Sequence, residues 1–149
     1  MEIAIGADHA GFEFKEQLKD FLLKNNYKVK DFGAHTFDKE DGFPDYASPL
    51  AKAIGNGEYD RGILVCGSGI GVSIAANKVK GAYAALLTDV YSAERSALSN
   101  NSNIACFGAF TLGTKLVEEL TKVWLSHEFE PGCASQPKVD RYREYDMNR

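Results

Sequence analysis

The sequence predicts an α/β fold in which helices cover both faces of a five-stranded parallel sheet, giving three layers. Five short apolar segments alternate with segments of helical periodicity, which is the pattern of a parallel sheet with right-handed crossovers. No linker, repeat or low-complexity segment interrupts the alternation. With 149 residues, 44% hydrophobic and 26% charged, the chain has the size and composition of one globular domain, residues 1–149.

The first half of the chain contains three predicted strands and two helices. A short apolar strand covers 2–6, and a helix follows whose apolar face is made by Phe14, Leu18, Phe21 and Leu22. The segment 27–32 alternates like a strand with one more polar face, which places it near an edge of the sheet. A loop rich in Gly, Asp and Pro at 33–45 precedes a helix at 46–55, and 61–65 is a buried strand.

The second half begins with a glycine-rich loop and its helix, and then repeats the alternation. The fourth and fifth strands are predicted at 82–87 and 103–108, with a helix at 90–98 between them. A helix over 113–125 has an apolar side made by Leu116, Val117, Leu120, Val123 and Trp124. The chain then becomes polar, and a last helix is predicted at 138–147.

Composition and charge argue against several classes of function. A net charge of −4 gives no basis for binding nucleic acid or an anionic membrane. No apolar run approaches the roughly 20 residues that span a bilayer, and the N-terminus lacks the basic start of a signal peptide. Cys66, Cys106 and Cys133 form no CxxC pair, as in a reduced cytoplasmic protein. Because no His, Cys, Asp or Glu set has metal-ligand spacing, neither a metal nor another cofactor is expected.

Two loops at predicted strand ends carry reactive side chains. They are GADHAG at 6–11, after the first strand, and CGSGIG at 66–71, after the third. Ligands of parallel sheets bind beyond the carboxyl ends of the strands, near the point where strand order reverses. If the first and third strands are neighbours, Asp8 and His9 face Cys66 across one cleft. An alternative for Asp8, which does not exclude a second role, is that it caps the following helix.

The glycine loop does not fit three familiar phosphate-binding patterns. A P-loop needs glycine at position 72, a thiol phosphatase loop needs arginine there, and the residue is valine. A dinucleotide fingerprint needs a third glycine at 72 or 74, and neither position has one. What remains is a group of backbone N–H donors that attract negative charge and favour the thiolate of Cys66. Such a thiolate suits abstraction of a carbon-bound proton beside a carbonyl. The alternative is that Cys66 is a small buried apolar residue.

Five segments, spread almost from end to end, resemble those of a known family: GADHAGFEFKEQL, DYAS, DRGILVCGSGIGVSIAANK, YSAERSALSNNSN and WLSHEFEPG. The chain resembles the type B ribose-5-phosphate isomerases, within a wider family that includes galactose-6-phosphate and tetrulose-phosphate isomerases. The resemblance implies a Rossmann-like fold and metal-free aldose–ketose isomerisation through an enediolate, in carbohydrate metabolism. It also implies a homodimer or a dimer of dimers whose active sites take residues from both subunits.

Carried over by position, the resemblance implies a role for each residue of the site. Cys66 is the base that moves a proton between C1 and C2, and Asp8 binds sugar hydroxyls. The Ser68 hydroxyl stabilises the enediolate together with the backbone amides of Gly67, Gly69, Ile70 and Gly71. His9 binds the phosphate, and Asn100 reaches the substrate oxygen from the partner subunit.

The sequence also departs from the family at two functional positions. Ser99 stands where the family has a histidine that is credited with opening the sugar ring. Phe110 stands where the family has a phosphate-binding arginine, and Lys138 is one of the cations that remain for the phosphate. We expect Ser99 and Lys138 to lie in the substrate site.

The leading substrate is ribose 5-phosphate, which would place the enzyme in the pentose phosphate pathway. The first alternative is a tetrulose 4-phosphate isomerase, and the second is a non-catalytic sugar-phosphate or nucleotide-binding module. The apolar side of the helix over 113–125 needs cover, and a tail held only by its own chain would fray. We therefore expect the tail, 134–149, to dock on a partner subunit.

Overall fold

The computed structural model describes residues 1–148 and has a five-stranded, entirely parallel sheet, as predicted. The strands are β1 (Glu2–Ala7), β2 (Lys28–Asp31), β3 (Arg61–Cys66), β4 (Ala84–Leu86) and β5 (Ile104–Gly108). Their order in the sheet is β2-β1-β3-β5-β4, so the half-polar β2 lies at one edge, as its alternation indicated.

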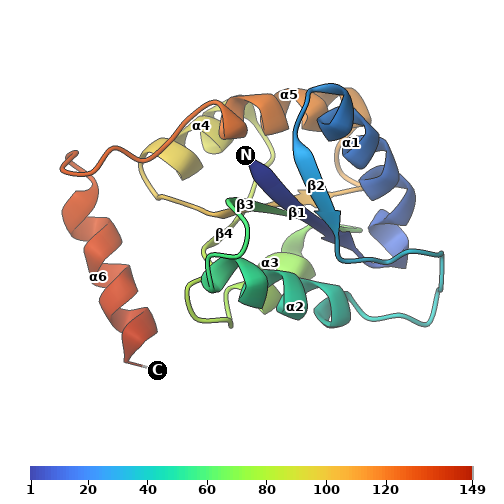
Figure 1. Cartoon of the computed structure of the whole chain (residues 1–149), viewed down its shortest axis with the longest axis horizontal. Helices are drawn as coiled ribbons and strands as arrows, with labels where there is room; N and C mark the ends of the chain where they lie inside the picture. The colour runs from blue at the N-terminus through green and yellow to red at the C-terminus, as the bar shows by residue number, and fades with distance from the viewer. Residues whose placement is uncertain (149) are drawn as a thin grey trace.

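Helices cover both faces of the sheet (Figure 1). One face is covered by α1 (Phe12–Lys24), α4 (Val90–Leu98) and α5 (Thr114–Leu125), and the other by α2 (Phe43–Gly55) and α3 (Ile70–Ala76). Of the predicted apolar side of α5, Val117, Leu120 and Trp124 are buried in the first layer and Val123 is partly buried, whereas Leu116 is exposed. Trp124 is fully enclosed and donates a hydrogen bond to Ser102. The three-layer arrangement follows from the sequence because each helix buries one apolar stripe against the sheet.

Several element boundaries differ from the sequence prediction. Helix α2 begins at Phe43 rather than at 46, because Pro44 occupies its first turn, where the missing N–H of proline costs no hydrogen bond. Strand β4 is three residues long instead of six, since only Ala84–Leu86 pair with β5. The last helix, α6, covers Gln136–Met147 and so begins two residues earlier than predicted.

The chain reverses its direction of travel across the sheet between β1 and β3. From β1 it moves outward to β2, and it then returns to place β3 on the other side of β1. The register pairs Ala7 with Val65, so Asp8 and Cys66 occupy the next positions along two neighbouring strands. The two predicted loops therefore meet at the carboxyl edge of the sheet, at the position where α/β proteins bind ligands.

Helix α6 stands apart from the three layers, beside the β4 edge (Figure 1). Val139 and Asp146 are its buried residues, and Tyr142 and Asp146 provide its main hydrogen bonds to the body. Arg149, the last residue of the predicted tail 134–149, lies outside the described residues. Within residues 1–148, no helix combines the length and the apolarity that crossing a membrane requires.

Candidate active site

Cys66 is the last residue of β3, and its side chain is only 4% exposed. The backbone N–H of Gly69 points back at it and donates a hydrogen bond to Sγ at 3.1 Å. Gly69 reaches that position with φ of +76°, in the left-handed region that glycine adopts without strain. The glycine loop thus turns one of its amides toward the sulfur, which stabilises negative charge on a thiolate.

The other glycines of this loop allow two aromatic rings to approach the backbone. A Cβ atom added at Gly67 would lie 2.9 Å from the ring of Phe110, and one added at Gly71 would lie 2.9 Å from the ring of Phe43. Between them, the exposed Ser68 hydroxyl accepts a hydrogen bond from the N–H of Ile70 at 3.3 Å. The loop is therefore a polar strip of amides and a hydroxyl with phenyl rings at both ends.

Asp8 follows β1 and is buried. Its carboxylate caps a short helical turn, His9–Gly11, by accepting the N–H of Gly11 at 3.1 Å, so the capping role considered from the sequence is real. Burial raises the pKa of Asp8 and outweighs the hydrogen bond from Gly11 and the charge of His9. A buried, partly desolvated carboxylate beside a reactive loop is a candidate for accepting hydrogen bonds from substrate hydroxyls.

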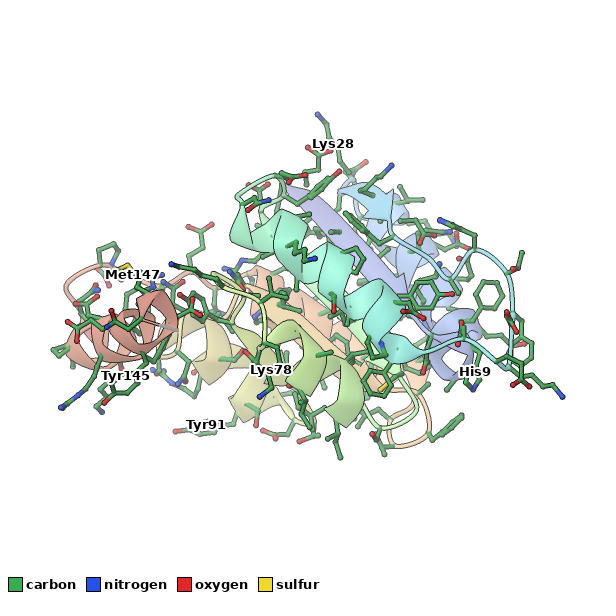
Figure 2. All side chains as sticks on the ribbon, turned by 90° about the horizontal axis from the view of Figure 1, so that it is seen from below. His9, Lys28, Lys78, Tyr91, Tyr145 and Met147 are labelled. Carbon is green, nitrogen blue, oxygen red and sulfur yellow. The ribbon has the colours of Figure 1, made fainter. Side chains whose placement is uncertain are left out.

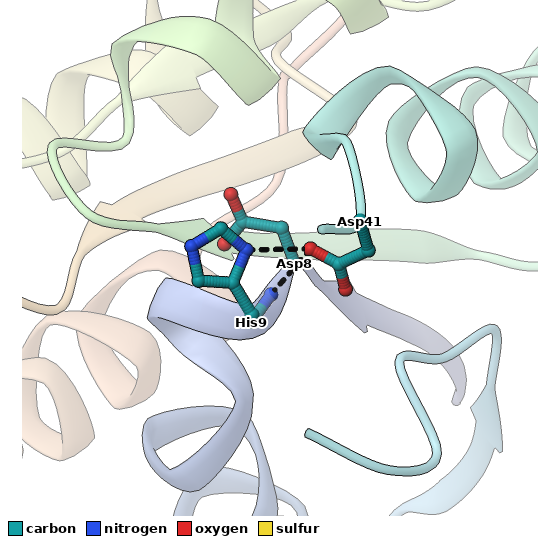
Figure 3. A group of neighbouring side chains, drawn as sticks. All are labelled: Asp8, His9 and Asp41. Atoms are coloured by element: carbon teal, nitrogen blue, oxygen red, sulfur yellow. Dashed lines mark hydrogen bonds and ion pairs between the residues drawn. The ribbon is translucent and has the colours of Figure 1, made fainter. Parts of the chain in front are cut away.

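His9 is bound to Asp41, a residue that sequence reasoning did not single out (Figure 3). The His9 Nδ1 atom lies 2.6 Å from the Asp41 carboxylate, which also accepts the backbone N–H of His9 at 3.0 Å. Asp41 belongs to the loop between β2 and α2, which returns to the same edge of the sheet. The available sequence signal was that this loop follows a strand and is rich in aspartate. Because Asp41 lies 32 residues from His9, the sequence did not predict their contact.

Asp8, His9 and Asp41 also form a group that could hold a metal ion. One ligand atom from each lies within 4.8 Å of the others, although the sequence showed no metal-ligand spacing because Asp41 is distant along the chain. Within this group the His9 Nδ1 atom is already engaged by Asp41. The Asp8 carboxylate is engaged by the N–H of Gly11 instead, and we assign the group no metal.

The remaining predicted site residues lie elsewhere in the same chain. Asn100 accepts a hydrogen bond through its carbonyl from the Tyr142 hydroxyl of α6 at 2.5 Å, and Ser99 is bound by the Arg95 guanidinium. Lys138 is exposed on α6 itself. Figure 2 shows α6, with Tyr145 and Met147, at the end of the molecule opposite His9. One chain therefore brings together Cys66, Ser68, Asp8 and His9 but not Ser99, Asn100 or Lys138.

A groove of about 720 Å³ lies between α6 and the β4 edge. Leu86, Tyr91, Arg95, Asn100 and Tyr145 are among the residues that line it. Among the described residues, its lining includes neither Cys66 nor Asp8 nor His9. The groove therefore has a different lining from the Cys66 cluster, although Leu86, which lines the groove, lies beside Gly69 of the glycine loop.

Comparisons with known proteins agree on one family. Residues 3–142 match the family model described as Ribose/Galactose Isomerase. The chain is 43% identical to D-erythrulose-4-phosphate isomerase 2 of Mycolicibacterium smegmatis, over 98% of this chain and 97% of that one. It is also 43% identical to Ribose-5-P isomerase B of Listeria innocua, over 99% and 98%. The solved structure of ribose-5-phosphate isomerase B from Clostridium thermocellum matches with a TM-score of 0.95 at 40% identity, covering 99% of both chains.

Proposed function

The chain belongs to the ribose/galactose isomerase family of aldose–ketose isomerases, and we propose that it isomerises a sugar phosphate with Cys66 as the base. One observation carries the proposal: the Cys66 sulfur is buried at a strand end and accepts the N–H of Gly69, and Asp8 and His9 directly follow the neighbouring strand β1. Binding alone gives no reason for a thiol at this position, whereas proton abstraction needs a base, which a thiolate can be.

The proposed reaction moves one carbon-bound proton. The Cys66 thiolate takes the C2 proton of the open-chain aldose, leaving a thiol and an enediolate, and returns it to C1 of the ketose while a proton shifts from O2 to O1. The amides of 67–71 and the Ser68 hydroxyl donate to the enediolate oxygen, where negative charge develops. Asp8 accepts hydrogen bonds from sugar hydroxyls, and His9 binds the phosphate.

A second copy of the chain completes the site in this proposal. Asn100 accepts a hydrogen bond from Tyr142 of α6, and Lys138 belongs to α6, which Figure 2 shows at the end of the molecule opposite His9. The groove beside α6 is lined with exposed aromatic side chains, including Tyr91 at 74% and Tyr145 at 65% exposure. Apolar area of this kind favours burial against a partner, and a twofold dimer would place Asn100 and Lys138 of one copy near Cys66 of the other.

Ribose 5-phosphate is the leading substrate, because it appears in the names of a relative and of a solved structure that match nearly the whole chain. Ser99 favours a second candidate, erythrulose 4-phosphate, because a hydroxyl has no pKa near neutrality and cannot move a proton as imidazole does. A four-carbon sugar esterified at O4 cannot close a furanose ring, so it needs no ring-opening group. The relative from Mycolicibacterium smegmatis, whose name carries this substrate, supports the candidate.

An isomerase assay over four-, five- and six-carbon sugar phosphates tests the proposal. If Ser99 sets the preference, turnover of erythrulose 4-phosphate should rival or exceed that of ribose 5-phosphate. A rate on ribose 5-phosphate at least tenfold higher than on erythrulose 4-phosphate would remove the second candidate. Binding of sugar phosphates without turnover of any would instead support a non-catalytic module.

A further inference from the structure

Asp41 holds His9 at two points with a single oxygen atom. Its Oδ1 atom lies 2.6 Å from the ring Nδ1 and also accepts the backbone N–H of the same residue at 3.0 Å. The side chain of Asp41 is 6% exposed, whereas that of His9 is 33% exposed. The buried carboxylate of Asp41 thus binds one edge of the His9 ring and leaves the other edge free to contact a ligand.

The bond also fixes which ring atom faces outward. An ionised carboxylate only accepts hydrogen bonds, so the shared proton belongs to Nδ1 of His9. The Nε2 atom then lies on the side of the ring away from Asp41, as Figure 3 shows. The ring of Phe37 stands edge-on to the imidazole, with centroids 6.0 Å apart, and supports the same orientation.

We propose that Asp41 is a positioning residue, which orients His9 and keeps it charged so that Nε2–H donates to the phosphate of the substrate. This inference rests on the proposed function for the identity of the anion. Its geometric basis, the double hydrogen bond from a buried carboxylate, stands independently of it. Asp41 touches no substrate atom in this scheme and acts through His9.

The charges around the ring agree with this role. The hydrogen bond with Asp41 raises the pKa of His9, desolvation opposes it, and the carboxylates of Asp8 and Asp38 add to the rise. These carboxylates come from the end of β1 and from the loop before α2. On α2 itself, the Tyr46 hydroxyl faces Asp41 rather than the imidazole. His9 is therefore more fully protonated at neutral pH than an isolated histidine, whose pKa is about 6.5.

The consequence depends on pH in a defined direction. Asp41→Asn removes the largest cause of the raised pKa of His9, so the variant's His9 has a lower pKa than the wild type's. Once the pH exceeds the variant's pKa, a smaller fraction of His9 is imidazolium in the variant than in the wild type. Below both values His9 is charged in either protein. We therefore expect the KM of Asp41→Asn for the sugar phosphate to rise about 3- to 10-fold near pH 8 and less than twofold near pH 5.5, with kcat little changed.

Proton NMR of the His9 imidazole, assigned by its loss in His9→Gln, gives a readout that needs no activity. The titration is recorded with and without sulfate, an anion whose charge is constant over this pH range. Asp38→Asn is the matched control, because Asp38 faces His9 from the same loop but acts on it only through its charge. Asp41→Asn should lower the pKa of His9 more than Asp38→Asn does, and weaken sulfate binding mainly at high pH.

The two proposals fail in different ways. An active isomerase whose Asp41→Asn variant keeps the His9 titration unchanged would overturn the role of Asp41 and leave the reaction standing. A KM that stays raised near pH 5.5 would mean that the substitution has merely disrupted the loop. That result would also overturn the role of Asp41. A chain that isomerises no sugar phosphate, but in which Asp41→Asn shifts both the titration and sulfate binding, would uphold Asp41 and overturn the reaction.

Discussion

Cys66 is the residue on which the proposed chemistry depends most directly. Cys66→Ala should lower kcat by about 10²- to 10⁴-fold, the usual contribution of a general base. Cys66→Ser should also be poor, since a hydroxyl is far less acidic than a thiol. The fold should persist in both variants because the change in volume is small.

Cys106→Ala is the matched control for this prediction. Cys106 is a fully buried thiol on β5. Burial in the core raises its pKa, so it stays protonated near neutral pH and cannot act as a base. Its replacement should cost about 1 kcal/mol of stability and leave the chemical step intact. Steady-state assays and thermal unfolding of the two variants separate the roles. A Cys66→Ala enzyme with near-normal kcat would assign the base to another residue.

Ser99 gives a second prediction at this scale. Ser99→His should raise kcat/KM for ribose 5-phosphate more than for erythrulose 4-phosphate, because only the five-carbon substrate rests as a closed ring and benefits from an imidazole. The ratio of the two kcat/KM values, measured on one enzyme preparation, cancels errors in active-site concentration. An unchanged ratio would show that ring opening is handled by other residues, with Asp8 and His9 as the next candidates.

Sequence reasoning found the residues of this site that follow strands and missed the one that does not. Cys66 and Asp8 could be predicted because each directly follows an apolar strand, and parallel strands end at one edge. Asp41 could not, since it lies in an irregular loop whose path is set by contacts of the folded chain. The ring of Phe110 over Gly67 is likewise a consequence of packing that no local pattern encodes.

At the scale of elements, the turn between β3 and α3 depends on Gly69. An alanine Cβ there would lie 2.6 Å from the Leu86 side chain and 2.8 Å from the backbone of Phe107, at a φ of +76°. Gly69→Ala should therefore cost about 2–4 kcal/mol, combining backbone strain with overpacking. It should also lower kcat, because the amide would move off the Cys66 sulfur.

Gly57→Ala isolates the contribution of backbone strain to this result. Gly57 has a nearly equal φ of +75°, and an added Cβ would meet nothing within 4 Å. Its cost should be about 1–2 kcal/mol, with kcat unchanged. Thermal or urea unfolding measures both variants. Equal destabilisation by the two substitutions would contradict the packing explanation for Gly69.

Helix α1 is joined to the end of β2 by a buried ion pair that makes stability depend on pH. The fully buried Lys15 ammonium lies 2.8 Å from Asp31, and Lys19 lies 2.8 Å from its other oxygen. Burial raises the pKa of Asp31, but the hydrogen bonds from Lys15, Lys19 and the N–H of Gly33 outweigh it, so the pKa is lowered. The pair therefore stabilises the fold fully above the unfolded pKa of about 3.9, and this contribution is lost as the pH falls below it.

Asp31→Asn should accordingly lower the free energy of unfolding by about 2–3 kcal/mol near neutral pH, since it leaves Lys15 buried with a weakened partner. The difference from wild type should stay constant above the unfolded pKa of about 3.9 and shrink as the pH falls below it, through the lowered pKa at which Asp31 of the folded wild type becomes protonated. Asp20→Asn, at an exposed position on α1, is the control and should change little. A difference that stays constant with pH would mean that the charge of Asp31 is not what stabilises the fold.

The boundaries of elements were harder to predict than their existence. All five strands and the predicted helices are present, because each carries an apolar period that burial enforces. Strand β4 is shorter than its apolar run because it lies at the edge of the sheet and pairs on one side only. Helix α2 is longer than its apolar face because Pro44 and Gly42 set its start.

At the scale of the whole molecule, α6 buries little of its surface against its own chain. The helix stands apart from the three layers (Figure 1). The groove between it and β4 is lined by Tyr91 and Tyr145, which are labelled in Figure 2 and are exposed. The same region carries Asn100, whose expected role is at a substrate that Cys66 also reaches. The second copy that we propose would fill the groove and receive Asn100, and would so account for both features with one contact.

Mixing inactive variants tests this shared site directly. Cys66→Ala and Asn100→Ala each inactivate a different half of the same site, so a mixed dimer contains one site with both halves intact. Half of the dimers are mixed after random exchange, and half of their sites are complete, so about a quarter of the wild-type activity should return. Mixing Cys66→Ala with Asp8→Asn is the control and should restore nothing, because both changes fall in the half supplied by one chain. The same recovery in both mixtures, or a fully active monomer by light scattering at micromolar concentration, would exclude a site shared between subunits.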